Sequence, residues 1–335
     1  MLRKISTLGL ILLPALSFSS DPANLPVPPT GFDSKSTSIP HGTVTASLTY
    51  QTQKYNTQKV TIYTPPGYST SQKYPVVYLM HGIGGNEVSW IGQGSNEGDA
   101  ANIMDYLLSK NLCKPMIVVM PDGNTKGASD GFSAFGDVLI GDLIPWVEKN
   151  YSVAADPDSR ALSGLSMGGG QTFNFGFPHT DLFHYLGPYS AAPNTQDPTA
   201  TIKDVAAIKR DMKFIYMSYG STDGLVNNGK KYHDFLDQNN VTHVWQIEAG
   251  LGHEKRAWDR SFYNFAQKIF LGPATGIAIR PVAESMRASV RFGRSPMGAS
   301  KILIARPDGK GLVIPDGRAL RAPPAASLFD GIHLP

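Results

Sequence analysis

The chain has 335 residues, enough for one large domain with extensions or for two domains. A hydrophobic content of 41% and an aromatic content of 10% are ample for a packed core and exclude global disorder. The formal net charge of +3 gives no argument for a nucleic-acid partner. The charge is unevenly spread, because residues 271–335 hold nine Lys or Arg against four Asp or Glu, so the basic excess belongs to the C-terminal part.

The N-terminus has a secretory pattern. Arg3 and Lys4 precede an apolar stretch at residues 5–16, and small residues follow at positions 15–19. The stretch is too short to span a bilayer comfortably, so residues 1–19 are predicted to be a removed signal peptide. Cys113 is the only cysteine, which excludes an intramolecular disulfide and favours a half-buried structural thiol. We therefore expect a secreted or extracytoplasmic protein from a bacterial source.

Residues 20–41 are rich in proline and form an extended lead-in. Residues 43–50 and 59–64 then alternate between apolar and polar side chains, which predicts two antiparallel edge strands. Residues 74–80 and 116–120 are continuous apolar runs, typical of buried parallel strands. The sequence therefore predicts a sheet that begins with an antiparallel edge and continues with parallel strands.

Two helices are predicted between and after these strands. Residues 99–110 have apolar side chains at helical spacing, and Asp99 is positioned to cap them. Residues 137–151 have a helical period in which Pro145 marks a kink or a first turn. Strands that alternate with helices at this interval predict an α/β fold, with a mostly parallel central sheet covered by helices on both faces.

The most informative motif is Gly164-Leu165-Ser166-Met167-Gly168, which follows a short strand and opens a helix. A serine in G-x-S-x-G between a strand and a helix is the nucleophile elbow of α/β-hydrolases. The turn is so tight that the flanking positions must lack a side chain, which explains both glycines. Ser166 is therefore predicted to be a nucleophile.

An acid and a histidine follow the serine in the order that an α/β-hydrolase requires. Asp223 comes after the apolar run 214–219, and His253 comes after the alternating run 241–248. Both lie in loops at the carboxyl ends of successive strands, where open α/β sheets place their ligands. Ser166, Asp223 and His253 are the predicted catalytic triad.

Other residues are weaker candidates for the catalytic acid and the catalytic histidine. Asp122 follows a different strand, and Glu254 adjoins His253 too closely to orient it. His81 precedes a glycine loop, which suits a structural or oxyanion-loop role. The remaining histidines are expected at the surface or in turns: His41, His179, His184, His233, His243 and His333.

The oxyanion hole of this fold uses the backbone N–H after the nucleophile and one from an early glycine-rich loop. These donors are predicted to be Met167 and Ile83. Trp90 and Trp258 flank the two catalytic loops; packing is the simpler role for each, and substrate contact is the alternative. No H-E-x-x-H motif and no G-K-[ST] phosphate loop is present, so we expect neither a metal nor a cofactor.

Only 57 positions separate Ser166 from Asp223, and two β–α steps occupy most of them. A large cap domain is therefore not expected, and the site should be open to bulky substrates. The α/β-hydrolase domain is predicted to cover residues 42–271. Residues 272–335 are rich in Gly, Pro, Ala and Arg, and two similar Pro-Asp-Gly segments predict either a small β module or a flexible basic tail.

Several of these motifs together resemble carbohydrate esterase family 1, the esterase-D-like group that holds bacterial feruloyl esterases and acetylxylan esterases. The segments that carry the resemblance are 28–33 (PPTGFD), 39–42 (IPHG), 63–68 (YTPPGY), 74–85 (YPVVYLMHGIGG), 89–90 (SW), 164–169 (GLSMGG) and 252–253 (GH). The resemblance covers roughly residues 28–271. It matches the triad to Ser166, Asp223 and His253, and the oxyanion donors to Met167 and Ile83.

The resemblance implies a secreted serine esterase that acts on ester decorations of plant xylan. A feruloyl group is favoured over an acetyl group, with an acyltransferase of the same superfamily or a non-catalytic carbohydrate-binding descendant of the fold as further alternatives. The expected partner is an ester-decorated cell-wall polysaccharide or oligosaccharide, with no nucleic acid and no membrane after signal cleavage. The C-terminal segment loosely resembles terminal sorting domains of secreted bacterial proteins, which implies attachment to the cell surface.

Overall fold

The computed structural model describes residues 25–271, 290–294, 300–305 and 311–314. The chain divides into two compact units, residues 1–271 and 272–335, at the position where the composition changes. The predicted signal peptide, residues 1–19, lies outside the described residues. No helix among the described residues is long and apolar enough to cross a membrane.

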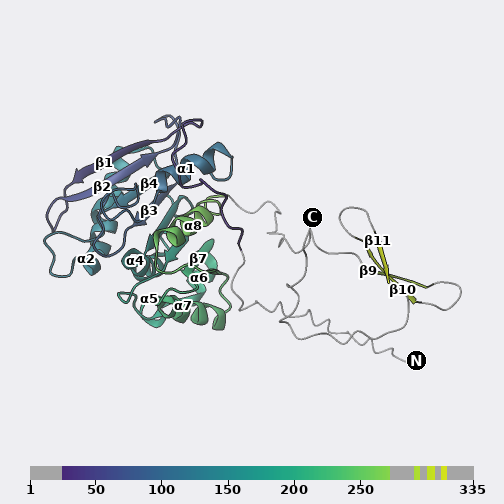
Figure 1. The fold of residues 1–335 in the computed structure, drawn as a ribbon. Coiled ribbons are helices and arrows are strands. Elements are labelled where there is room, and N and C mark those ends of the chain that lie inside the picture. The colour runs from purple at the N-terminus through teal and green to yellow at the C-terminus, as the bar shows by residue number, and fades with distance from the viewer. Residues whose placement is uncertain (1–24, 272–289, 295–299, 306–310, 315–335) are drawn as a thin grey trace, which may run out of the picture. The chain divides into compact units, whose positions relative to one another are not determined.

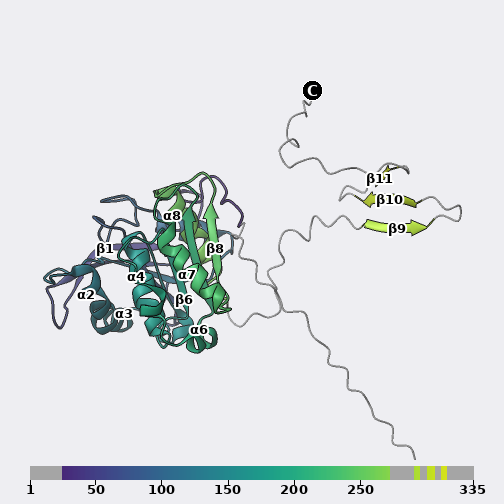
Figure 2. The ribbon, with the colours of Figure 1, turned by 90° about the horizontal axis from the view of Figure 1, so that it is seen from below.

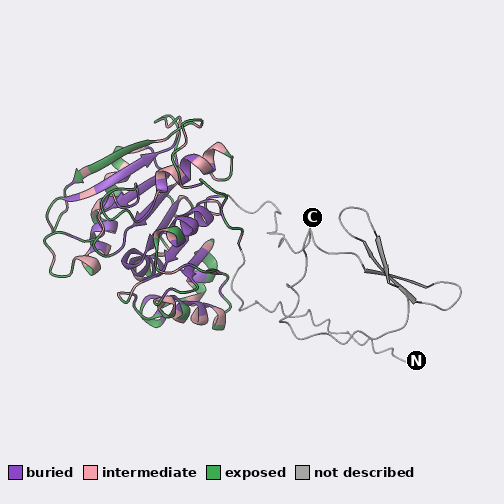
Figure 3. Ribbon diagram, in the orientation of Figure 1, coloured by how far each residue is buried: buried purple, intermediate pink, exposed green. Residues whose placement is uncertain are grey.

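An eight-stranded sheet forms the centre of the first unit, in the order β1-β2-β4-β3-β5-β6-β7-β8 (Figure 1). Its strands are β1 (Thr43–Tyr50), β2 (Gln58–Thr64), β3 (Val76–Met80), β4 (Ile117–Pro121), β5 (Arg160–Leu165), β6 (Tyr185–Tyr189), β7 (Phe214–Gly220) and β8 (Val244–Glu248). β1 and β2 are antiparallel and the six others are parallel, which confirms the predicted edge. Figure 3 shows β1 largely exposed and the inner strands buried.

Helices cover both faces of the sheet. They are α1 (Ala100–Ser109), α2 (Gly131–Val138), α3 (Ile144–Asn150), α4 (Met167–Gly176), α5 (Pro198–Thr201), α6 (Val205–Asp211), α7 (Val226–Gln238) and α8 (Lys255–Ala266). Apolar residues of α1 and α8 join one core cluster, and those of α2, α3, α4, α6 and α7 join the other. Figure 2 shows α3, α4 and α6, which belong to the layer of helices that packs on this second cluster. The α/β-hydrolase fold is confirmed, without a large cap between Ser166 and Asp223.

Three local details differ from the predictions. The helix predicted at residues 137–151 is α2 followed by a wider π-helical turn, Leu139–Leu143, and by α3, in whose first turn Pro145 lies. Asp99 precedes α1 but makes no side-chain capping bond, because its carboxylate pairs with Lys255. Two β–α steps were expected between Ser166 and Asp223, but the residues of the first strand there, β6, were not located, since a Gly187-Pro188 pair is typical of a turn.

In the second unit the described residues form a three-stranded antiparallel sheet of β9 (Val290–Arg294), β10 (Ser300–Ala305) and β11 (Gly311–Ile314). The two similar segments noted in the sequence begin in β10 and β11, where Leu303 pairs with Val313. Their Pro-Asp-Gly turns lie outside the described residues. Of the two alternatives for this segment, the strands favour the β module.

Candidate active site

Ser166 sits at the turn between β5 and α4 with φ at +50°, a left-handed conformation that non-glycine residues rarely adopt. Both flanking glycines are required by close approach. A Cβ on Gly164 would lie 2.8 Å from the Gly168 carbonyl oxygen, and one on Gly168 would lie 2.7 Å from the Met80 and His81 carbonyl oxygens. The end of β3 and the start of α4 therefore approach each other too closely to admit a side chain at position 168.

The three predicted triad residues come together. His253 Nε2 lies 3.0 Å from Ser166 Oγ, and His253 Nδ1 lies 3.1 Å and 3.3 Å from the two Asp223 carboxylate oxygens. These distances join nucleophile to base and base to acid in one chain of hydrogen bonds. The rival Asp122 lies beside a different ring: its carboxylate is 3.5 Å from His81 Nε2 and pairs with Lys126, whereas the acid bonded to His253 is Asp223.

The loops that carry the acid and the histidine are bonded directly to each other. The Thr222 N–H and hydroxyl both donate to the Leu251 carbonyl at 2.9 Å, and the Ser221 N–H donates to the Glu248 carbonyl at 2.9 Å. Gly220 lets the two loops touch, because a Cβ there would lie 2.2 Å from the Leu251 carbonyl oxygen. Asp223 and His253 are therefore positioned as one unit at the ends of β7 and β8.

Electrostatics fix the protonation pattern of the triad. The Asp223 side chain has no exposed surface, and this burial by itself raises its pKa; hydrogen bonds from the His253 ring and the Leu225 N–H outweigh burial and hold the pKa below the ordinary 3.8. Asp223 is thus a carboxylate at neutral pH and accepts the Nδ1 proton of His253. That leaves the Nε2 lone pair facing the Ser166 hydroxyl, as a general base requires.

The proposed oxyanion donors lie in a tight turn and at a helix start. Gly82 donates its N–H to Glu97 Oε2 at 2.7 Å, and the Gly85 N–H closes the turn onto the Gly82 carbonyl at 3.1 Å. Ile83, between them, is 70% exposed. Because the Gly82 N–H already has a buried acceptor, Ile83 remains the donor that we predict from this loop, with Met167 as the second.

His81 has the structural role that the sequence favoured. Its ring is buried, Nδ1 donates to the Gly82 carbonyl at 2.6 Å, and Nε2 accepts the Gly123 N–H at 2.9 Å. Both nitrogens are therefore used to hold the glycine loop against the end of β4.

The two tryptophans differ. Trp90 is only 1% exposed, packs on Phe262 and donates its indole N–H to the Met80 carbonyl, so the alternative of a substrate contact is wrong for this residue. Trp258 is half-buried, and its ring stands edge-on to His253 with the centroids 5.1 Å apart. A substrate contact by Trp258 stays a prediction.

The predicted surface or turn position is wrong for two of the other histidines. His233 and His243, expected at the surface or in turns, are largely buried and face each other with 2.8 Å between His233 Nδ1 and His243 Nε2. His233 also has a partner one helical turn away, Asp237. The two rings are buried because α7 packs against the segment before β8, and no local sequence pattern indicates that contact. His333 lies outside the described residues.

A polar cluster beside the triad was missed altogether. Lys255, two positions after His253, pairs with Asp99 and with Asp259, and Asp259 also accepts the Asp99 N–H at 2.9 Å. The cluster ties the start of α8 to the loop that leads from the oxyanion turn to α1. The sequence indicates this cluster only weakly. Lys255 and Asp259 are an i, i+4 pair of opposite charge, and such pairs are common on exposed helices.

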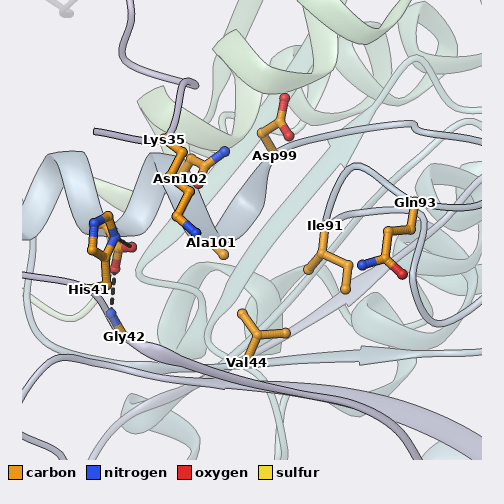
Figure 4. Close-up of a pocket in the computed structure, with 10 residues that line it drawn as sticks. Lys35, His41, Gly42, Val44, Ile91, Gln93, Asp99, Ala101 and Asn102 are labelled. Carbon is orange, nitrogen blue, oxygen red and sulfur yellow. Dashed lines mark hydrogen bonds and ion pairs between the residues drawn. The ribbon is translucent and has the colours of Figure 1, made fainter. Parts of the chain in front are cut away.

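A hollow of about 470 Å³ lies between β1 and α1, and none of the triad residues lines it. Figure 4 shows the residues that line this hollow. The residues that line it are Lys35, His41, Gly42, Val44, Ile91, Gln93, Asp99, Ala101, Asn102 and Asp105. On one wall, Asp105 accepts bonds from the His41 ring and the Gly42 N–H (Figure 4). This hollow is therefore separate from the place where an acyl group would meet Ser166.

Comparison with known proteins agrees with this geometry. The Esterase family model, described as "Putative esterase", matches residues 54–269. An endo-1,4-beta-xylanase/feruloyl esterase from Xylanibacter ruminicola is 32% identical over 243 residues, which are 69% of this chain and 32% of that protein. Endo-1,4-beta-xylanase Y from Acetivibrio thermocellus is 29% identical over 182 residues, 49% of this chain and 16% of that protein. The chain thus matches a third or less of the length of these relatives.

Among solved structures, a CE1 ferulic acid esterase from Anaeromyces mucronatus in complex with ferulic acid has a TM-score of 0.65 and 26% identity, covering 76% of this chain and 98% of that chain. The family model covers more than half of the chain. The chain therefore belongs to the Esterase family, and its resemblance to carbohydrate esterase family 1 is confirmed. With this triad it is a serine carboxylic ester hydrolase.

The arrangement accounts for ester hydrolysis in two steps. His253 takes the Ser166 proton as Oγ attacks the acyl carbonyl, and Asp223 stabilises the imidazolium that forms. His253 then returns the proton to the departing alcohol. In the second step His253 activates a water molecule, which releases the acid and restores Ser166.

Proposed function

We propose that this esterase is secreted and removes feruloyl groups from plant xylan. The observation that carries the proposal is the aligned triad in a chain that resembles, over most of its first unit, a xylanase/feruloyl esterase and a ferulic acid esterase. The two-step reaction requires no cofactor. The two backbone donors, Ile83 and Met167, would each stabilise the oxyanion by about 3 kcal/mol.

Trp258 supports an aromatic acyl group. Its ring is half-buried next to His253, so an apolar surface borders the base that faces Ser166. A cinnamoyl ring gains from such a surface, whereas an acetyl group is too small to extend onto it. The same residue therefore offers a way to separate the two ester classes.

The test compares initial rates on methyl ferulate and on acetylated xylan, with Ser166→Ala as the control for adventitious hydrolysis. We expect faster release of ferulate. Acetate release alone would make the chain an acetylxylan esterase. An excess of transferred over hydrolysed product with an added alcohol would make it an acyltransferase.

A second variant sharpens the assignment. Trp258→Leu is expected to raise KM for methyl ferulate about fivefold and to leave the rate on 4-nitrophenyl acetate within about twofold, since a lost aromatic contact is worth roughly 1 kcal/mol. Equal losses on both esters would show that Trp258 only positions His253, and would remove this support for the feruloyl group.

Export is proposed on the sequence pattern of residues 1–19. Expression of the full chain in a bacterial host, followed by N-terminal sequencing of the extracytoplasmic product, is expected to show a mature N-terminus near residue 20. Protein retained in the cytoplasm with Met1 intact would contradict it. Comparing the cell-surface fraction of the full chain with that of residues 1–271 tests a sorting role for the C-terminal unit.

A further inference from the structure

Two histidines and a carboxylate converge at the beginning of β8, outside the active site. His233 and Asp237 lie one turn apart on α7, and the chain then reverses and presents His243 just before β8. His233 Nδ1 and His243 Nε2 are 2.8 Å apart. The Asp237 carboxylate lies 3.6 Å from His233 Nε2 and 3.8 Å from His243 Nε2.

Contacts within the protein hold both histidine rings in a fixed orientation. His243 Nδ1 lies 2.8 Å from the Val241 carbonyl, which can only accept, so Nδ1 carries a proton and Nε2 presents a lone pair to His233. His233 stacks on Trp245 with the planes 6° apart and the centroids 5.0 Å apart. A ring nitrogen that donates to a backbone carbonyl while its other nitrogen faces inward is the usual arrangement around a metal-binding histidine.

We propose that His233, Asp237 and His243 bind a divalent transition-metal ion, for which Zn²⁺ is the best match. Two imidazole nitrogens and one carboxylate suit this ion, which takes ligands at about 2.0–2.1 Å in tetrahedral geometry. The ligand atoms of such an ion stand about 3.3 Å apart. With His233 Nδ1 and His243 Nε2 as the imidazole ligands, now 2.8 Å apart, the two rings need to separate by about half an ångström to admit the ion, and the Asp237 carboxylate lies 3.8 Å from His243 Nε2. In the described part of the chain, the potential ligand atoms of these three residues all lie within 4.8 Å of one another.

The exposure of the three side chains indicates how the ion would enter, and their place in the fold indicates what its binding would do. The side chains of His233 and His243 are 8% and 4% exposed, whereas Asp237 is 29% exposed, so the open side next to Asp237 admits the ion and a water ligand. The site lies at the start of β8, while His253 follows the end of that strand. A bound ion would therefore tie α7 to the edge strand β8 and stabilise the fold, without taking part in ester hydrolysis.

The experiment uses the full chain, stripped of metal with a chelator that is then removed, and titrated with Zn²⁺ against a chromophoric chelator. We expect one tight equivalent per chain. At a free Zn²⁺ concentration of 100 times Kd, the melting temperature should rise by about 5–10 °C. Substitution with Co²⁺ should give visible absorption typical of nitrogen and oxygen ligands.

Three variants decide whether these residues hold the ion. His243→Gln should abolish the tight equivalent, and Asp237→Asn, a more conservative change at a partly exposed position, should weaken it at least tenfold. Asp234→Asn is the matched control, because the Asp234 side chain is 45% exposed on the same helix and pairs only with Lys230 among its described neighbours. Unchanged zinc binding in both ligand variants, or no tight equivalent in the wild-type chain, would overturn the proposal and leave the two rings as a hydrogen-bonded pair.

Discussion

Two histidine–aspartate pairs in this molecule have similar geometry and different consequences. His41 Nδ1 lies 2.7 Å from Asp105, which also accepts the Gly42 N–H and the Tyr63 hydroxyl. His253 Nδ1 lies 3.1 Å and 3.3 Å from the Asp223 oxygens. Among the described residues, no hydroxyl or thiol is hydrogen-bonded to the second ring nitrogen of His41, whereas His253 Nε2 faces Ser166. A strong pair does not by itself make a catalytic site; alignment with an activated hydroxyl does.

The largest expected effect comes from removing that hydroxyl. Ser166→Ala should lower kcat/KM on an aryl acetate by about 10⁵-fold or more, because covalent catalysis is lost. The melting temperature should stay within about 2 °C of the wild type. Near-normal turnover by a highly purified variant would refute the role of Ser166.

The comparison between the two pairs can be tested with the same substitution at each acid. Asp223→Asn should lower kcat/KM by about 10⁴-fold, since an amide no longer fixes the His253 tautomer or stabilises its cation. Asp105→Asn should leave kcat/KM within about twofold while lowering the free energy of unfolding by about 1–3 kcal/mol, because a buried acceptor of three bonds is changed. Similar kinetic losses in both variants would mean that the hydrogen-bond geometry does not distinguish the pairs.

The elbow offers a test of packing. Gly168→Ala adds a Cβ 2.7 Å from two backbone oxygens that cannot easily move, so the free energy of unfolding should fall by about 3 kcal/mol. Gly141→Ala is the control, because nothing lies within 4 Å of its Cβ, and stability there should stay the same or rise slightly. Chemical denaturation measures both, and equal stabilities would contradict the close approach.

The smallest expected effect concerns pH. Burial raises the pKa of Asp259 to about 6 in the folded chain, against an ordinary 3.8, although Lys255 opposes this shift. The folded state therefore holds this proton more tightly than the unfolded state, and the resulting stabilisation is lost as pH rises from about 4 to about 6. Asp259→Asn should remove this decline in unfolding free energy, which is at most about 3 kcal/mol for a pKa raised by about two units. An unchanged slope across that pH range, relative to the exposed Asp234→Asn, would exclude the raised pKa.

Much of the molecule follows from local sequence. The buried strands β3, β4 and β7 are continuous apolar runs, and such runs can be satisfied only inside a sheet covered on both faces. Gly164 and Gly168 mark the elbow because no residue with a Cβ fits there. The order Ser, Asp, His along the chain then predicts the triad.

Long-range packing decided the rest. Trp90 and Trp258 look equivalent in the sequence, yet one is enclosed by the core and the other borders the base. The convergence of His233 and His243 depends on how α7 reverses into β8, which no local pattern encodes. Sequence alone determined which residues carry the chemistry, because backbone sterics and periodicity act locally; only the tertiary structure decided which side chains of similar type meet, because that depends on contacts between segments far apart in the chain.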